Sequence, residues 1–306
     1  MTVEIRKAAS GGLWKHRHFY LFIAPFFLLF AIFGLYPLLF SLYLSFVKWD
    51  GLTPAHWVGL SNFQKMLGDD QLWTALGNTV VIGLLYVPPM MILAFLFAQW
   101  LNAPWLKFKA LYRAAFFIPC VTPMAVIAFV FQLIFSSEHG VLNYALQHLF
   151  PWLHLSPIPW LESESWSKAA IAILVVWRWT GYNMVLMLAG LQGIPADYYE
   201  AAELDGASKI QQMLHITLPL LRPTLAFCGL LSLLGTLYMF DEIFVMTNGG
   251  PGSSSTNFGM YLFQISFDDF RLGYASCVAY SVSITVIVAT TLMNRANRRA
   301  LDEGRR

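Results

Sequence analysis

The sequence predicts an all-α integral membrane protein with six transmembrane helices. Of its 306 residues, 58% are hydrophobic and only 12% are charged, whereas roughly 25% of the residues in a typical soluble domain are charged. Six segments also have a charge-free core of about 20 predominantly apolar residues, the length that a helix needs to cross a bilayer. We therefore expect the chain to be surrounded by lipid and to have no nucleic-acid partner.

The first apolar segment, residues 19–47, is expected to remain in the protein as a transmembrane helix. It carries no charged residue over 29 positions, whereas the apolar part of a cleaved secretory signal spans roughly 7 to 15 residues. Pro25 and Pro37 predict kinks within it, where neighbouring helices would satisfy the freed carbonyl groups. Residues 1–18 in front of it form a basic segment.

Five further spans are predicted at residues 78–100, 114–135, 169–191, 220–245 and 275–293. Pro88 and Pro89 predict a kink in the second span. The six spans make up one transmembrane domain over residues 19–293, and a basic tail follows at residues 294–306.

The basic residues of the loops predict the orientation of the chain. Fourteen lysines and arginines lie in residues 1–18, 101–113, 192–222 and 294–306, whereas the loops on the other side carry only four. Because cytoplasmic loops of membrane proteins carry the excess of Lys and Arg, we expect both termini in the cytoplasm. The loop between the fourth and fifth spans, residues 193–219, is expected on the same side.

Nothing in the sequence predicts catalysis or a metal site. The three cysteines, Cys120, Cys228 and Cys277, lie in apolar spans and give no disulfide framework. The seven histidines are scattered and lack the spacing of metal ligands. No Gly-Lys dipeptide occurs, so a phosphate-binding GxxxxGK[ST] loop is excluded, and ATP, if it drives this protein, binds elsewhere. We therefore do not expect an enzyme.

Arg178 lies near the middle of the fourth span, where an unpaired charge costs about 2.5–3.5 kcal/mol. Its side chain must therefore face protein or water. Trp179 and Tyr182 fall on or near the same helix face by the i, i+3 and i, i+4 spacings, and Asn183 follows them. Two interpretations stay open: a buried ion pair or carbonyl clamp that fixes helix packing, and a role in a solute path.

Acidic residues lie near the outer end of the fifth span. Asp241 and Glu242 are candidate partners of Arg178, and Tyr238 lies one turn before Asp241. Aromatic faces beside hydrogen-bonding groups suit sugar rings, although aromatic residues make up 16% of the chain and packing or a membrane belt explains many of them. A solute path on this chain would comprise Arg178, Trp179, Tyr182, Asn183, Tyr238 and Asp241.

The loop of residues 193–219 is predicted to contain two short helices joined at a glycine. Asp197, with Glu200 three residues later, has the spacing of a capping box, and Gly206 suits a left-handed residue at a helix C-terminus. Acidic residues outnumber basic ones here, whereas a loop that only lay on an anionic leaflet would be mostly basic. A protein-docking surface is therefore the favoured interpretation.

The second helix of this loop is expected to begin near Ala207 or Ser208 and to break at Pro219, because proline lacks the backbone N–H that a helix interior needs. Helical spacing predicts one shared face for Ile210, Met213, Leu214 and Thr217.

The spacing in this loop resembles the EAA motif of bacterial ABC importer permeases. Glu200-Ala201-Ala202 is followed after three residues by Gly206 and, after nine more, by Ile216-x-Leu218-Pro219. Further likeness lies in Leu188-Ala189-Gly190-Leu191-Gln192 before Ile194-Pro195, and in Phe240-Asp241 followed by Thr247-Asn248-Gly249-Gly250-Pro251. These stretches are similar to the carbohydrate-uptake branch, in particular its maltose- or glycerol-phosphate-permease-like first subunit. The extra N-terminal helices and large outer domain of maltose systems have no counterpart here.

The resemblance implies a type I ABC importer permease in the inner membrane of a bacterium, carrying a sugar, oligosaccharide, polyol or glycerol phosphate. It implies three kinds of partner: a second homologous permease, two cytoplasmic ATPases and an extracytoplasmic solute-binding protein. ATP and Mg²⁺ would bind to the ATPases, so this chain would hold no cofactor. The residues that would dock on an ATPase are Glu200, Ala201, Ala202, Asp205 and Gly206.

The alternative is a self-sufficient secondary transporter, which also uses intramembrane charges and broken helices. It would need inverted repeats and a coupling-ion site, neither of which is evident, and a docking loop would have no purpose in it. A channel or a structural membrane subunit would explain the apolar composition but not the motif.

Overall fold

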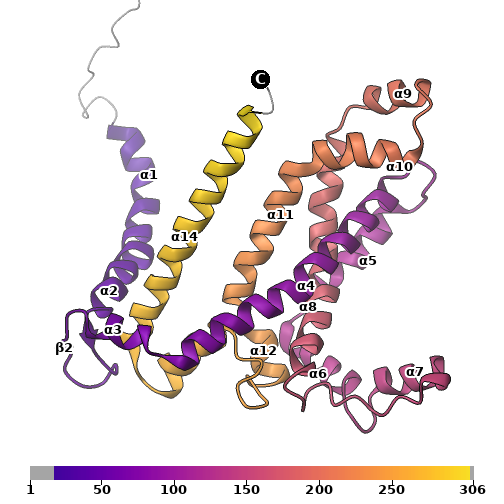
Figure 1. Ribbon diagram of the computed structural model, residues 1–306. Helices are drawn as coiled ribbons and strands as arrows, with labels where there is room; N and C mark the ends of the chain where they lie inside the picture. The colour runs from indigo at the N-terminus through magenta and orange to yellow at the C-terminus, as the bar shows by residue number, and fades with distance from the viewer. Residues whose placement is uncertain (1–16, 304–306) are drawn as a thin grey trace, which may run out of the picture. The chain divides into compact units, whose positions relative to one another are not determined.

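The computed structural model describes residues 17–303, and the side chains of residues 20–292, as an almost entirely helical protein (Figure 1). The chain divides into two compact units, Met1–Gly68 with Ile265–Arg306, and Asp69–Gln264. The predicted segment 1–18 lies outside the described residues except for its last two. In the predicted tail, residues 294–303 continue the last helix, and residues 304–306 lie outside the described part.

The first unit contains the first and last spans. Its elements are α1 (Arg17–Phe30), the π-helix η2 (Ala31–Leu35), α2 (Tyr36–Leu44), β1 (Val47–Lys48), β2 (His56–Trp57), α3 (Ser61–Leu67), most of the π-helix η5 (Gln264–Asp268) and α14 (Leu272–Glu303). The two short strands pair antiparallel, and α14 packs against α2, α3 and β1. Asn62 donates hydrogen bonds to the carbonyls of Ser45 and Val47, both at 3.0 Å, and so fixes the end of the first span.

The first span keeps its apolar side chains outside the chain's own core. In Tyr20–Leu44, 0% of the most apolar stretch is buried within the chain. A contiguous apolar surface of this length is typical of a helix that contacts lipid or another protein.

The second unit holds both apolar cores. Its elements are α4 (Asp70–Asn102), α5 (Lys109–Val121), α6 (Met124–Ile134), α7 (Val141–Leu149), the 3₁₀-helix η3 (Pro151–Leu153), α8 (Trp166–Gln192), α9 (Asp197–Leu204), α10 (Lys209–Gln212), the π-helix η4 (Met213–Thr217), α11 (Leu218–Tyr238), α12 (Asp241–Met246) and α13 (Phe258–Phe263). α4 and α8 pack along each other and contribute buried residues to both cores. α5 approaches α8 at Gly181, where a Cβ atom would lie 1.8 Å from the carbonyl oxygen of Phe116.

Within residues 17–303, five helices are long and apolar enough to cross a membrane, and they coincide with the predicted first, second, fourth, fifth and sixth spans. Pro25, Pro88 and Pro89 lie inside helices that continue through them. The one irregularity in the first span is η2, a π-helix that ends two residues before Pro37.

The third span differs from the prediction of one helix over residues 114–135. It consists of α5 and α6, which are bent by 93° relative to each other. The break lies at Thr122 and Pro123, where Thr122 adopts an extended conformation. A residue before proline is pushed out of the helical region by contact with the proline ring, which explains the break.

The fifth span also differs from the predicted segment, residues 220–245. α11 ends at Tyr238, Met239 is extended, and α12 begins anew at Asp241. The buried amide of Asn257 donates to the carbonyls of Thr236, at 3.1 Å, and Met239, at 2.6 Å, which the end of α11 leaves without helical partners. The same side chain accepts the backbone N–H of Met260 and so also starts α13.

Pro219 does not break the helix, contrary to the prediction. α10, η4 and α11 run continuously from Lys209 to Tyr238, and Pro219 lies in the first turn of α11 directly after the π-helix. The wider turn of η4 changes the hydrogen-bonding register just before the proline, so the missing N–H falls where the new register does not require it.

We expect Asn257→Ala to destabilise the protein by about 1–3 kcal/mol, because two buried carbonyl groups lose their donor. Thermal unfolding of the purified protein in one detergent measures the effect. Asn102→Ala, which removes an exposed amide at the end of α4, is the matched control. Equal unfolding temperatures for the two variants would contradict this account of the break.

Candidate functional site

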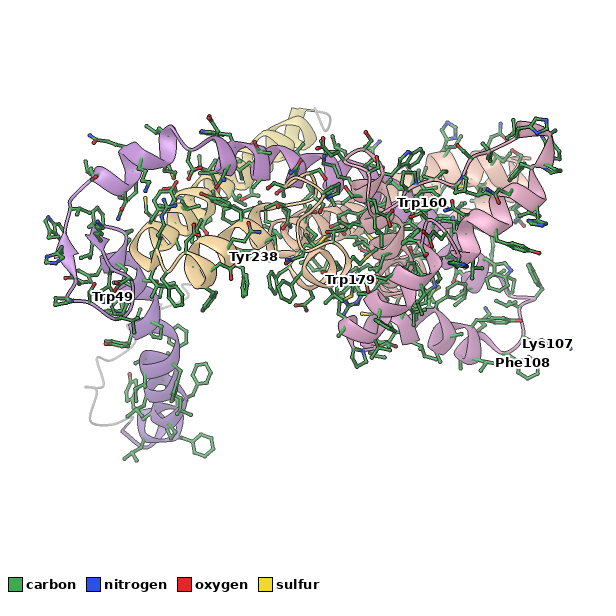
Figure 2. The ribbon with its side chains drawn as sticks, turned by 90° about the horizontal axis from the view of Figure 1, so that it is seen from below. Trp49, Lys107, Phe108, Trp160, Trp179 and Tyr238 are labelled. Carbon is green, nitrogen blue, oxygen red and sulfur yellow. The ribbon has the colours of Figure 1, made fainter. Side chains whose placement is uncertain are left out.

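A cavity of about 440 Å³ lies in the second unit between α4, α8, α11 and α12. All six residues predicted for a solute path line it: Arg178, Trp179, Tyr182, Asn183, Tyr238 and Asp241. Trp179 of α8 and Tyr238 of α11, which both line this cavity, are labelled in Figure 2. The break after Tyr238 positions the acidic residues, because α12 turns away from the axis of α11 and carries them onto the cavity wall.

Arg178 forms an ion pair with Glu242 across the cavity wall. Its Nη1 lies 3.4 Å from Glu242 Oε1, and the two side chains are only 14% and 10% exposed. The guanidinium also lies 5.5 Å from the ring centroid of Trp179, within the range of a cation–π contact. Glu242, and not Asp241, is therefore the partner of Arg178, and the pair clamps α8 to α12 while lining the cavity.

The aromatic side chains of the wall differ in how far they pack against other side chains of the protein. Trp179 and Tyr182 meet edge to face, with ring centroids 5.8 Å apart. Tyr238 is 67% exposed. Among the described residues, neither the Tyr182 nor the Tyr238 hydroxyl has a hydrogen-bond partner, so both can meet a solute.

Asn183 has a more structural position than the sequence suggested. It is only 3% exposed, and its Nδ2 donates to the carbonyl of Trp179 at 3.1 Å and contacts Met90 Sδ at 3.6 Å. One of these amide contacts lies within α8 and the other joins α8 to α4, and the amide oxygen is the part left for the cavity.

Sequence reasoning missed the contribution of α4. Tyr86 lines the cavity, and its hydroxyl donates to the carbonyl of Ser232 at 2.6 Å and lies 2.8 Å from Thr236 Oγ1. Tyr86 and Met90 share a helix face by their i, i+4 spacing, but nothing in the sequence indicates which helix this face meets.

The turn between α9 and α10 forms at Gly206 as predicted. The N-caps of these two helices differ from the prediction. Gly206 has φ +78°, the Ala207 N–H bonds to Ala202 O, and the Gly206 N–H bonds to Glu203 O, the two bonds of a Schellman motif. Ala196, not Asp197, is the N-cap of α9, and no side chain caps it. The capping box lies at Ser208 and Gln211 instead, at the start of α10.

The residues predicted to dock on another protein lie on the outside of this turn. Glu200, Ala201, Asp205 and Gly206 are exposed, and Ala202 is half-buried. A hollow of about 360 Å³ beside the turn is lined in part by Ala202, Asp205 and Gly206. Lys209 donates a hydrogen bond to Glu203, which lowers the pKa of this exposed carboxyl below its ordinary value.

The predicted apolar face of the second helix is wrong, because η4 interrupts the helical spacing. Thr217 is buried and Met213 packs on the core, whereas Ile210 and Leu214 are 67% and 49% exposed. Together with Leu204, which is 91% exposed, these two leave apolar side chains open on the turn.

Comparison with known proteins shows the family of this chain. A family described as the binding-protein-dependent transport system inner membrane component matches residues 91–302. The lactose transport system permease protein LacF of Rhizobium radiobacter is 36% identical over 282 residues, covering 91% of this chain and 93% of LacF. The arabinooligosaccharides transport system permease protein AraP of Bacillus subtilis is 33% identical over 298 residues, covering 94% and 93%.

A solved structure shares the fold. The bacterial alginate ABC transporter, crystallised in complex with an alginate pentasaccharide-bound periplasmic protein, contains a chain with a TM-score of 0.80 and 21% identity. The match covers 96% of this chain and 98% of that one. With its helical spans and its match to the family over most of its length, this chain belongs to the inner membrane components of binding-protein-dependent transport systems, the multi-pass permeases of ABC importers.

Proposed function

We propose that this chain is the permease subunit of an ATP-driven importer for a sugar, oligosaccharide, polyol or glycerol phosphate, and that the cavity between α4, α8, α11 and α12 is on the solute path. The observation that carries the proposal is the convergence of Arg178, Trp179, Tyr182, Asn183, Tyr238 and Asp241 on this one cavity. Ring faces beside hydroxyl and carboxylate groups fit the apolar faces and hydroxyl edges of a pyranose. The permeases LacF and AraP, both named for sugar transport, support the carbohydrate class.

The turn around Gly206 is the proposed coupling element. Its exposed carboxylates and apolar side chains would dock in a cleft of a separate ATPase subunit, which binds ATP and Mg²⁺. Closure of two such ATPases would pull on α9 and α10, and α10 is continuous with α11 on the cavity wall. ATP would thereby favour one of two states that open to opposite sides of the membrane.

The proposed assembly contains a second, non-identical permease, two ATPases and an extracytoplasmic solute-binding protein. The exposed apolar side chains of the first span are compatible with a neighbouring permease as well as with lipid. The alginate transporter was crystallised with a periplasmic protein, which supports an external donor of solute. A self-sufficient secondary transporter, the alternative, does not agree with the family to which this chain belongs.

The proposed orientation has both termini and the Gly206 turn in the cytoplasm. We expect a cysteine at Glu138 to react with an impermeant maleimide added outside spheroplasts, and a cysteine at Lys209 to react only after permeabilisation. The two positions are matched in access, because the native side chains are 85% and 81% exposed. Labelling at position 209 in intact spheroplasts would reverse the orientation.

Gly206→Asp is expected to lower solute-stimulated ATPase activity by roughly tenfold, equivalent to about 1.4 kcal/mol of docking free energy. No atom of the chain lies within 4 Å of a Cβ at this position, and Asp tolerates a positive φ better than most residues, so the fold should persist. Asn102→Asp, which adds the same charge at the exposed end of α4, is the control. Stimulation equal to wild type in a fully assembled Gly206→Asp complex argues against coupling at this turn.

Tyr182→Ala and Tyr238→Ala are expected to reduce solute uptake in proteoliposomes while the complex still assembles, because neither hydroxyl has a partner among the described residues. Asn183→Ala is the packing control and should lower the unfolding temperature, since one of its amide contacts joins α8 to α4. Normal uptake in both tyrosine variants would remove the cavity from the solute path.

A further inference from the structure

The charged side chains of the cavity wall do not balance. Among the fifteen residues that line the cavity, Arg178 is basic, whereas Asp241 and Glu242 are acidic. Arg178 and Glu242 neutralise each other at 3.4 Å. Asp241 is exposed, and no basic side chain in the described part of the chain forms an ion pair with it. The wall therefore presents one uncompensated negative charge.

The positive charge on the wall is compensated by Glu242, although the buried Nε of Arg178 has no hydrogen-bond partner in the described part of the chain. Glu242 occupies the Nη1 side of the guanidinium, and the Trp179 ring lies 5.5 Å away. An anionic solute that bound Arg178 would compete with Glu242 for the guanidinium, and both side chains of the pair are largely buried, at 14% and 10% exposed. Removing one partner from such a pair leaves a buried charge without compensation, which is strongly unfavourable.

We propose that this cavity admits uncharged polyhydroxylated solutes and rejects anions. Asp241 accepts hydrogen bonds from solute hydroxyls, and Glu242 acts as a specificity determinant by keeping Arg178 paired. The inference rests on the proposed function of the cavity, and among the solutes named there it selects neutral sugars and polyols over glycerol phosphate.

Two physical effects support this selection. A carboxylate accepts hydroxyl donors in short, charge-assisted hydrogen bonds, which favours a polyol. Because Asp241 is exposed, solvent screens its carboxylate, and an anion about 5 Å away is disfavoured by roughly fourfold, the effect expected at the dielectric constant of water. The alginate importer carries an acidic polysaccharide, but at 21% identity it shows only the fold, so the charge of this wall depends on its own residues.

The test measures the electrostatic potential of the cavity without knowledge of the solute. In the assembled complex, with the native cysteines replaced by alanine, Tyr238→Cys is modified by a cationic and an anionic methanethiosulfonate reagent of similar size. The ratio of the two rates is divided by the same ratio for free cysteine. We expect a preference for the cationic reagent of about threefold or more.

Asp241→Asn in the same background removes the uncompensated charge and should bring the rate ratio close to that of free cysteine. Glu242→Gln should shift the ratio further toward the anionic reagent, because Arg178 loses its partner. Leu52→Cys in the loop between β1 and β2, 87% exposed, is the matched thiol whose ratio Asp241→Asn must leave unchanged. An anionic preference in the parent, or a ratio insensitive to Asp241→Asn, overturns the proposal even if Glu242→Gln does not fold.

The two claims fail separately. The reagent ratio depends on charge alone and requires no transport. A cationic preference combined with normal uptake by Tyr182→Ala and Tyr238→Ala overturns the solute-path assignment, and the selection proposal with it. Reduced uptake in those variants with no cationic preference overturns only the selection against anions.

Discussion

The structure depends on the rule that a backbone inside a membrane must find its hydrogen-bond partners within the protein. Hydrocarbon offers none, so a helix can end at membrane depth only where another group takes over its carbonyls. Asn257 does this for α11, with one amide that serves two carbonyls and also accepts the Met260 N–H in the first turn of α13. Close approach of the chain is possible because Gly259 follows, where a Cβ atom would lie 2.6 Å from the carbonyl oxygen of Met239.

The cavity follows from this break. If α11 continued straight, Glu242 would extend the helix instead of lying 3.4 Å from Arg178. The turn at Met239 and Phe240 places α12 against α6 and α8, with Ile243 and Met246 in the core that α4 and α8 share. One amide thus supports both the ion pair and the wall that presents Asp241. Gln132 of α6 adds a second anchor by donating to the carbonyl of Val245 at 2.7 Å.

The sequence was sufficient to predict the parts of the structure that depend on composition and local spacing. Charge-free length located the spans, apart from the breaks in the third and fifth, and the cost of an unpaired Arg178 indicated that its side chain faces protein or water. The sequence was insufficient to predict contacts that depend on the register between packed helices. The spacing of Tyr86 and Met90 shows that they share a helix face. That Tyr86 lies opposite Ser232, however, depends on how α4 crosses α11. The bend at Thr122-Pro123 had a local signal, whereas the continuity through Pro219 had none, because a π-helix is not distinguishable from an α-helix by its residue types.

The π-helix η4 has a consequence for the phase of the long helix that contains it. An α-helix advances about 100° per residue, so the extra residue in a π turn rotates everything that follows by about that angle relative to an uninterrupted helix. Ser232 and Tyr238 point into the cavity with this offset included. The π-helix η4 therefore sets the angular alignment between α10, at the docking surface, and the solute-facing side of α11. Deletion of a single residue between Met213 and Thr217 would shorten the helix by only about 1.5 Å, yet it would turn a different set of side chains toward the solute.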